Sequence, residues 1–223
     1  MRLLLIADHE ETGLWDYWNA SKTKDVDLIL SAGDLSPKYL EFLTTMVNRP
    51  LLYVRGNHDG VYDSDEPLGC TGIDDRIYIY KGLRILGLGG SYRYGSRKDM
   101  YTEGEMKKRI RTLKHALQAT GGIDILLTHA PAQGYGDLED LAHRGFDCFN
   151  DLLEEYHPMY MVHGHVHRNY GGFERERIHS SGVRILNAYG AYMIDIADDE
   201  LHQAQKPGFL TRYRTGKTII WDR

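Results

Sequence analysis

The stretch Met159-Tyr160-Met161-Val162-His163-Gly164-His165-Val166-His167 joins a short apolar run to two histidines that are two residues apart. The apolar run predicts a buried strand, and side chains at positions i and i+2 of an extended segment share a face. We therefore expect His165 and His167 to point the same way just beyond the end of this strand. Two histidines alone do not define a site, so the rest of the chain has to supply the remaining groups.

Four other apolar runs are also followed by side chains that carry chemistry. These side chains are Asp8 after residues 3–7, Asp34 after residues 28–32, Asn57, His58 and Asp59 after residues 51–54, and His129 after residues 125–128. In open α/β sheets, ligands bind at the carboxyl ends of the strands. The sequence therefore predicts that carboxylate, amide and imidazole groups converge on one edge of a sheet.

The apolar runs are strand-length and largely lack alternation, which is typical of strands buried on both faces. Helix patterns lie between them at residues 37–48, 102–119 and 146–156, with a proline at the start of the first and Gly121-Gly122 after the second. Residues 76–80 and 183–196 instead favour short strands joined by glycine turns. We interpret this mixture as an α/β fold in which two sheets pack face to face with helices outside.

The 223 residues include 27 basic and 32 acidic side chains, giving a formal net charge of −5. This length fits one α/β domain, so we expect a single domain over residues 1–223. The acidic balance argues against a long electrostatic contact with DNA or RNA. A small anionic substrate remains compatible, because bound metal ions can outweigh the net charge locally.

The two cysteines, Cys70 and Cys148, lie far apart and form no CxxC pattern. We interpret them as free thiols of a reducing compartment. The apolar run that precedes Asp8 is too short for a signal sequence or a membrane span. These features predict a cytoplasmic protein without a membrane partner.

Taken in order, Asp8, Gly33-Asp34, Gly56-Asn57-His58-Asp59, His129 and Gly164-His165-Val166-His167 resemble the signature of the calcineurin-like metallophosphoesterase superfamily. The resemblance spans residues 1–190 and implies a four-layer αββα sandwich of two mixed β-sheets flanked by helices. Residues 129–138 and 164–171 are also similar to the small cyclic-nucleotide phosphodiesterase-like branch, over a shorter match.

The resemblance implies a site for two divalent metal ions. Asp34 would bridge the ions, Asn57, His129 and His165 would complete one site, and Asp8 and His167 would belong to the other. It also implies that a water between the ions becomes a hydroxide nucleophile near neutral pH. His58 would contact the phosphate and protonate the leaving oxygen, and Asp59 would orient the His58 ring.

One position departs from the family pattern. The first motif is Asp-x-His, whereas this chain has Asp8-His9-Glu10. Residue 10 projects to the same side as Asp8, so Glu10 is better placed than His9 to reach the metal. A carboxylate favours manganese or magnesium over zinc or iron, and we expect Mn²⁺, with Fe, Mg, Ni or Zn as alternatives. Ligation by His9 after a local shift and a weak or empty first site are the competing hypotheses.

The loop after the apolar run at residues 85–88 is the candidate substrate contact. Arg93 and Tyr92 lie in it, close in sequence to Tyr94, Arg97 and Lys98, and such a cluster can stack a base and grip a phosphate. A loop whose charges only contact solvent is the alternative.

These features predict a metal-dependent phosphoric ester hydrolase, and specifically a phosphodiesterase that acts on small phosphate esters. The Asp-Arg-Gly of phosphoprotein phosphatases is absent, since Asp34 is followed by Leu35-Ser36-Pro37-Lys38. The alternatives are a nuclease or a phosphomonoesterase of the same superfamily, or a non-catalytic scaffold, for which Glu10 is the only support.

Overall fold

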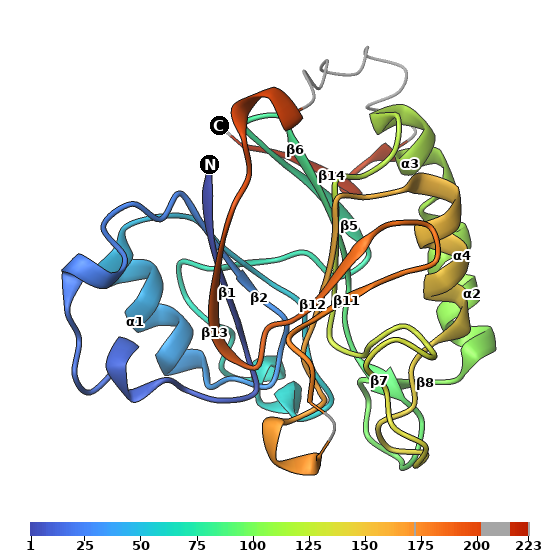
Figure 1. The fold of residues 1–223 in the computed structure, drawn as a ribbon, viewed down its shortest axis with the longest axis horizontal. Coiled ribbons are helices and arrows are strands. Elements are labelled where there is room, and N and C mark those ends of the chain that lie inside the picture. The colour runs from blue at the N-terminus through green and yellow to red at the C-terminus, as the bar shows by residue number, and fades with distance from the viewer. Residues whose placement is uncertain (172, 202–214, 223) are drawn as a thin grey trace.

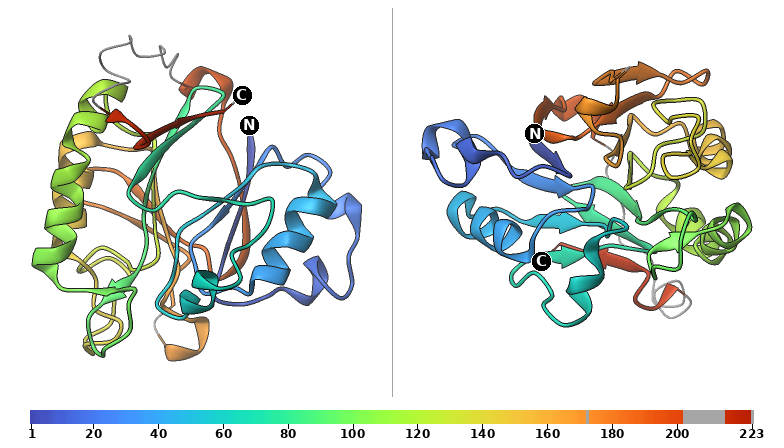
Figure 2. Two further views of the ribbon diagram at one scale, coloured as in Figure 1. Left: turned by 180° about the vertical axis from the view of Figure 1, so that it is seen from behind. Right: turned by 90° about the horizontal axis from the view of Figure 1, so that it is seen from below.

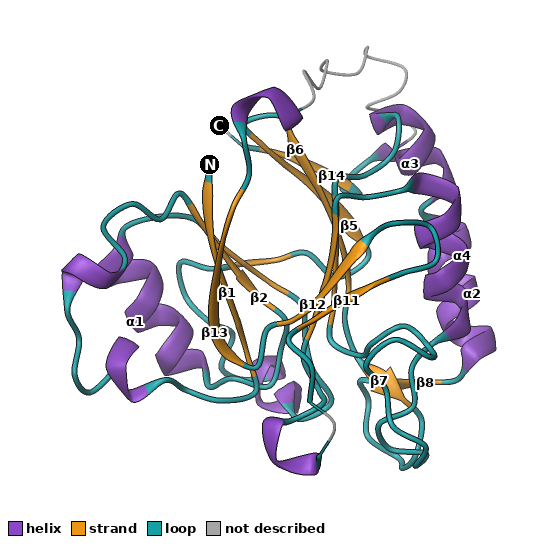
Figure 3. Ribbon diagram, viewed as in Figure 1, coloured by secondary structure: helices purple, strands orange, loops and turns teal. Residues whose placement is uncertain are grey.

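Two mixed β-sheets packed face to face, with helices on both outer faces, form the protein (Figure 1, Figure 3). The computed structural model describes residues 1–171, 173–201 and 215–222. The arrangement is the four-layer αββα sandwich predicted from the sequence.

The first sheet has five strands in the order β13-β1-β2-β3-β4. Their bounds are β1 Arg2–Ala7, β2 Leu28–Ser31, β3 Leu51–Tyr53, β4 Thr71–Gly72 and β13 Gly190–Asp195. Strands β1 to β4 run parallel, and β13 pairs antiparallel with β1. The carboxyl ends of β1, β2 and β3 therefore meet at one edge of this sheet.

The second sheet has seven strands in the order β11-β12-β10-β9-β6-β5-β14. Their bounds are β11 Glu176–Ile178, β12 Arg184–Asn187, β10 Tyr160–His163, β9 Ile125–Thr128, β6 Leu83–Leu88, β5 Arg76–Tyr80 and β14 Ile219–Trp221. Strands β6, β9, β10 and β12 run parallel. A small parallel pair, β7 Ser91–Tyr92 and β8 Met100–Tyr101, follows β6.

The core between the sheets is built from alternate residues of each strand. In β1, Leu3 and Leu5 point into this inter-sheet core, whereas Leu4 and Ile6 pack on the outer face of the first sheet. Both sets are buried, so the strand shows no polar alternation in sequence. Close packing of the two sheets brings their carboxyl edges together, and this edge carries the candidate site.

Helices cover the two outer faces (Figure 2). Helix α1 (Pro37–Val47) covers the first sheet, and α2 (Glu103–Thr112), α3 (Lys114–Thr120) and α4 (Asp147–Tyr156) cover the second. Short 3₁₀ turns complete the chain at η1 Thr12–Leu14, η2 Ala20–Lys22, η3 Asp59–Asp63, η4 Arg168–Tyr170 and η5 Asp198–Glu200.

The helix predicted over residues 102–119 is in fact two helices, α2 and α3. The expected N-terminus is present as a capping box, in which Thr102 and Glu105 bond each other's backbone N–H groups. The break falls at Leu113, whose backbone N–H bonds to the carbonyl of Ile110 and whose side chain is buried. This i to i−3 bond tightens the turn and redirects the chain.

A buried ion pair joins β6 to the end of α3, at the sheet edge opposite the candidate site. Arg84 donates to both carboxylate oxygens of Asp124, at 2.9 and 2.6 Å, and to the carbonyls of Thr120 and Gly121. Within the described residues, no helix is long and apolar enough to cross a membrane.

Candidate metal centre

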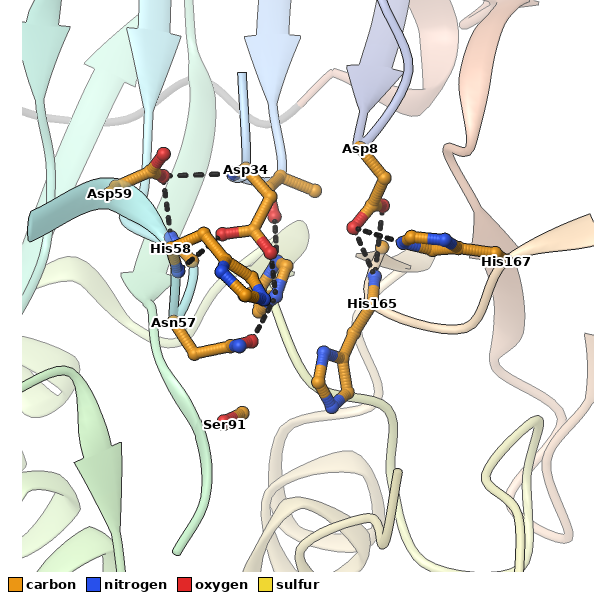
Figure 4. Close-up of polar contacts among 12 residues, drawn as sticks. Asp8, Asp34, Asn57, His58, Asp59, Ser91, His165 and His167 are labelled. Atoms are coloured by element: carbon orange, nitrogen blue, oxygen red, sulfur yellow. Dashed lines mark hydrogen bonds and ion pairs between the residues drawn. The ribbon is translucent and has the colours of Figure 1, made fainter. Parts of the chain in front are cut away.

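The structure brings the predicted metal ligands together from both sheets. Asp8 follows β1, Asp34 and Asn57 follow β2 and β3, His129 follows β9, and His165 and His167 follow β10. Figure 4 shows Asp34, Asn57 and His58 on one side of the site and Asp8 and His167 on the other. The polar groups converge at the carboxyl ends of the strands as predicted, but they come from the edges of two sheets and not from one.

Three of these residues have left-handed backbone conformations that side chains other than glycine seldom adopt. The φ angles are +62° at Asp8, +55° at Asp34 and +66° at His165. Each such residue costs of order 1–3 kcal/mol and persists only where surrounding contacts hold it. Backbone strain concentrated at three predicted ligands is a feature of functional sites.

Asp34, Asn57 and the fully buried His129 form the tightest cluster. The Nδ1 atom of His129 lies 2.7 Å from the carbonyl of Ala32, which can only accept, so the neutral ring is unprotonated at Nε2. That Nε2 lies 3.0 Å from Asn57 Oδ1 and 3.4 Å from Asp34 Oδ2. These three atoms are all hydrogen-bond acceptors and face one another, so they need a cation or a proton between them. Their lone pairs are the ligands expected for a metal ion.

The electrostatics of this cluster follow from the same contacts. Burial alone would lower the pKa of His129, but the Asp34 carboxylate more than offsets it and raises the pKa to about 10. Burial likewise acts to raise the pKa of Asp34, yet the His129 imidazole and the backbone N–H of His58 hold this pKa well below its usual range. The Asp34 carboxylate and the His129 imidazole therefore favour opposite charges on each other.

Asp8, His165 and His167 form the second part of the site. Both oxygens of Asp8 accept from the backbone N–H of His165, at 3.1 and 2.9 Å, and His167 Nε2 lies 3.4 Å from Asp8 Oδ1. His165 Nε2 lies 2.7 Å from the carbonyl of Ala142, which leaves Nδ1 unprotonated in the neutral ring. Burial lowers the pKa of His165 to about 3, so the ring stays neutral and able to bind a metal.

The two parts are close enough to share an ion. Ligand atoms of Asp8, Asp34 and His129 all lie within 4.8 Å of one another. The side chains come from β1 and β2 of one sheet and β9 of the other, so formation of the site depends on the packing of the two sheets.

Glu10 and His9 make different contacts, although the left-handed backbone at Asp8 departs from the extended geometry on which the prediction for residue 10 rested. Glu10 Oε1 accepts from the backbone N–H of Ser36, at 3.1 Å, beside the N-terminus of α1. His9 stacks on Tyr189 with ring centroids 5.7 Å apart. Glu10 thus has one oxygen engaged with the protein and Oε2 left for a metal, and its ligation stays a prediction.

Asp59 has a different position from the one expected. Its Oδ2 accepts from the backbone N–H groups of Asp34 and Gly56, at 2.9 and 2.7 Å, instead of contacting the His58 ring. Burial and the neighbouring Asp34 carboxylate raise the pKa of Asp59 to about 7. Asp59 therefore ties together the loops after β2 and β3 and does not orient His58.

Arg97 is the residue that contacts the His58 ring. Its Nη1 lies 2.6 Å from His58 Nδ1. A guanidinium only donates, so Nδ1 accepts and the proton of the neutral ring is on Nε2. Sequence reasoning placed Arg97 in the candidate loop but gave no reason to pair it with His58.

The two substrate residues predicted in the same loop lie elsewhere. Arg93 pairs with Glu105 of α2 and donates to the carbonyl of Met100. Tyr92 packs on Phe146, with ring centroids 5.4 Å apart. Tyr94 is the tyrosine that reaches the site, where its hydroxyl accepts from Asn57 Nδ2 at 2.9 Å.

Three further residues support the site, and two of them, Asn187 and Asp74, carried no signal in the sequence. Asn187, which is buried, donates to the carbonyl of Val166 and so holds the loop between His165 and His167. Asp74 accepts from the backbone N–H groups of Arg55 and Gly89, and thereby joins loops of the two sheets. Tyr170 stacks flat on His167, with centroids 4.8 Å apart.

A family model described as calcineurin-like phosphoesterase matches residues 1–169. The chain belongs to the calcineurin-like phosphoesterase family. The match contains every predicted metal ligand and His58, so the resemblance drawn from the motifs is confirmed.

Two UPF0046 proteins of Caenorhabditis elegans are similar to this calcineurin-like phosphoesterase. One is 28% identical over 177 residues, which cover 66% of this chain and 58% of the relative. The other is 21% identical over 183 residues, which cover 66% of this chain and 63% of the relative. The chain thus spans less than two thirds of the length of these relatives.

Two solved structures share the fold. One has a TM-score of 0.63 at 13% identity, over 87% of this chain and 94% of that chain. TT1561 of Thermus thermophilus has a TM-score of 0.59 at 14% identity, over 85% of this chain and 89% of that chain. At these identities the likeness shows the fold alone.

Family membership implies divalent metal ions, and the donor set fits them. The facing acceptors of His129, Asn57 and Asp34 would hold one ion, with His165 beside them. Asp8 and His167, with Glu10 as the predicted addition, would hold the other, and Asp34 is close enough to serve both. Oxygen and nitrogen ligands without a thiolate suit manganese, magnesium or iron.

Proposed function

We propose that the protein is a two-metal phosphodiesterase that hydrolyses small phosphate esters. The observation that carries the proposal is the convergence of His129 Nε2, Asn57 Oδ1 and Asp34 Oδ2, with Asp8 within reach. Such a set of acceptors is stable only around a cation or a proton. Divalent ions held there would supply a hydroxide nucleophile near neutral pH and offset charge on the phosphate oxygens.

His58 supplies a proton-bearing group beside those ligands. Its backbone N–H donates to Asp34 Oδ1, at 2.8 Å, so the residue is fixed next to the predicted bridging carboxylate. The side chain is exposed, and its Nε2 carries the proton while Arg97 occupies Nδ1. We infer that Nε2–H acts on the leaving oxygen of the ester.

The choice of a small substrate rests on charge and shape. A net charge of −5 disfavours an extended nucleic acid. The cavity next to His58 has a volume of about 310 Å³, which admits a small organic group. We infer that manganese is the preferred ion and that the protein works in the cytoplasm.

Replacement of His58 tests the enzyme against a non-catalytic scaffold. We expect His58→Ala to lower the rate of diester hydrolysis by about 10²–10⁴-fold, because a positioned proton donor contributes that much. Metal content, measured by mass spectrometry on the same samples, should stay unchanged because the His58 side chain is not a ligand. Equal rates for the wild type and His58→Ala would contradict the proposal.

A further inference from the structure

Among the described residues, Arg97 has no carboxylate partner. Its contact is with Nδ1 of His58, and no carboxylate of the described residues contacts it. Two neighbours in the same loop have such partners, since Arg93 pairs with Glu105 and Lys98 pairs with Asp63. A neutral imidazole does not neutralise a guanidinium, so Arg97 retains an uncompensated positive charge beside the candidate metal centre.

The loop that carries Arg97 is held on both sides of this residue. Lys98 Nζ contacts both oxygens of Asp63, at 2.9 and 2.8 Å, and Asp99 lies 3.4 Å from Arg55. On the other side, Tyr94 accepts from Asn57. These anchors fix the backbone, and the Arg97 side chain is presented to the site at low entropic cost.

A cavity of about 310 Å³ extends from the site to this loop. Its lining residues are Asn57, His58, Gly60, Arg97, Lys98 and Asp99. It begins at a predicted metal ligand and the proposed proton donor, so a leaving group that His58 protonates would extend into it.

The lining of this cavity carries a net positive charge. Its cations are Arg97 and Lys98 and its carboxylate is Asp99, while Asp63 and Arg55, the partners of Lys98 and Asp99, are not lining residues. Asp63 lies between Arg55 and Lys98, and Asp99 contacts Arg55, which leaves the charge of Arg97 in excess. An excess guanidinium at a pocket wall favours an oxyanion with two oxygens that can each accept an N–H bond.

We propose that Arg97 makes this cavity an anion-binding leaving-group subsite, so that the preferred substrate is a phosphate ester whose leaving group carries a second oxyanion, a carboxylate or a phosphate. The inference rests on the proposed function. In the hydrolysis, water adds to phosphorus, the bond from phosphorus to the leaving oxygen breaks, and that oxygen takes up a proton. Arg97 stays bound to the distant oxyanion and sets which ester is chosen.

Internal competition within one substrate tests the proposal. Phenyl 4-carboxyphenyl phosphate can release either phenol or 4-hydroxybenzoate, and chromatography gives the ratio of the two products for the manganese-loaded protein. We expect 4-hydroxybenzoate to predominate in the wild type, and Arg97→Met to reduce the ratio by about five- to tenfold, since a hydrogen bond between charged groups at a partly exposed site is worth that much. A product ratio that Arg97→Met leaves unchanged would overturn the assignment.

Two further variants control for general effects of charge. Arg111→Met removes an exposed guanidinium of α2 that donates to its own helix, and it should leave the product ratio unchanged. Lys98→Met removes a cation that Asp63 already neutralises, so it should change the ratio less than Arg97→Met. The reverse order would show that Arg97 does not select the anion.

Two further experiments, a second substrate and a binding measurement, identify the anion and cover the case of no turnover. The second substrate carries a 4-(phosphonomethyl)phenyl group in place of the 4-carboxyphenyl group. If Arg97→Met reduces the product ratio more with this substrate than with the carboxylate, the subsite is assigned to phosphate.

If no diester is hydrolysed, the proposed function fails, and calorimetry on the metal-loaded protein then decides the inference by itself. Wild type should bind 4-carboxyphenyl phosphate more tightly than phenyl phosphate. If the ratio of these two affinities is the same in Arg97→Met as in the wild type, the assignment of Arg97 is overturned.

Discussion

Asp59 and Asp34 are joined by a hydrogen bond in which the backbone N–H of Asp34 donates to Asp59 Oδ2 at 2.9 Å. The same oxygen accepts from the backbone N–H of Gly56 at 2.7 Å, and the carboxylate is almost fully buried. One atom therefore fixes the turns that present both Asp34, the predicted bridging ligand, and the residues after β3. This explains how a left-handed backbone at Asp34 is maintained.

Asp59→Ala should lower the free energy of unfolding by about 1–3 kcal/mol, because it leaves two buried N–H groups without an acceptor. Asp59→Asn should cost much less, since its amide oxygen can accept from both groups and burial, which raises the pKa of Asp59, favours a neutral side chain there. Urea denaturation of the three proteins measures both differences. Equal losses of unfolding free energy in Asp59→Ala and Asp59→Asn would show that the acceptor oxygen of Asp59 does not stabilise the fold.

Tyr94→Phe should weaken metal binding without removing a ligand. The Tyr94 hydroxyl accepts from Asn57 Nδ2 and so turns Asn57 Oδ1 toward His129. Loss of such a supporting partner costs about 10–100-fold in metal affinity. Calorimetric titration with Mn²⁺ measures the change, and Tyr17→Phe, at a residue that is 76% exposed, is the matched control. Identical affinities in both variants would contradict this role.

Glu10→Ala should reduce the number of tightly bound ions from two to one per chain. The expected reason is loss of Oε2 as a ligand of the site that contains Asp8 and His167. Elemental analysis after dialysis against a weak chelator gives the stoichiometry. Glu10→Gln keeps an acceptor for the Ser36 N–H, so it separates the metal role from support of α1. Two retained ions in Glu10→Ala would show that Glu10 is not a ligand.

Asp124→Ala should destabilise the fold by about 3–5 kcal/mol, because it leaves the Arg84 guanidinium buried without its partner. The pair lies at the sheet edge opposite the site, so the rate per folded molecule at low temperature should not change. Thermal and urea unfolding measure the loss. Asp25→Ala, which removes an exposed partner of Arg2, should cost less than about 1 kcal/mol. Similar losses in both would show that burial of the pair contributes little.

The fold and most of the site could be predicted because they depend on local patterns. Apolar runs identified the strands that end at Asp8, Asp34 and His129, and the geometry of parallel strands placed their carboxyl ends at one edge. The partition of these strands into two sheets depends on long-range pairing. Strand β12 lies in one sheet, and β13, which follows after two connecting residues, lies in the other. The sequence contains no signal for this change of sheet.

The contacts around the ligands could not be predicted, because they depend on how loops pass one another in space. Tyr92 and Tyr94 are equivalent candidates in sequence. In the structure, Tyr92 at the end of β7 packs on Phe146, whereas Tyr94 in the following turn contacts Asn57. The same turn directs Arg93 to α2 and Arg97 to His58. Asp59 follows His58 directly, but the 3₁₀ turn that it begins points its carboxylate to backbone N–H groups.

Metal-dependent hydrolysis of bis-p-nitrophenyl phosphate shows whether the candidate metal centre acts on phosphodiesters. Metal-stripped protein would be reloaded in turn with manganese, magnesium, iron, nickel or zinc, and p-nitrophenyl phosphate and the Asp34→Asn variant would be measured in parallel. We predict that turnover of the diester exceeds that of the monoester, is highest with manganese and is lost in Asp34→Asn. Binding of two ions without turnover of the diester under any of these conditions would contradict the proposed phosphodiesterase activity.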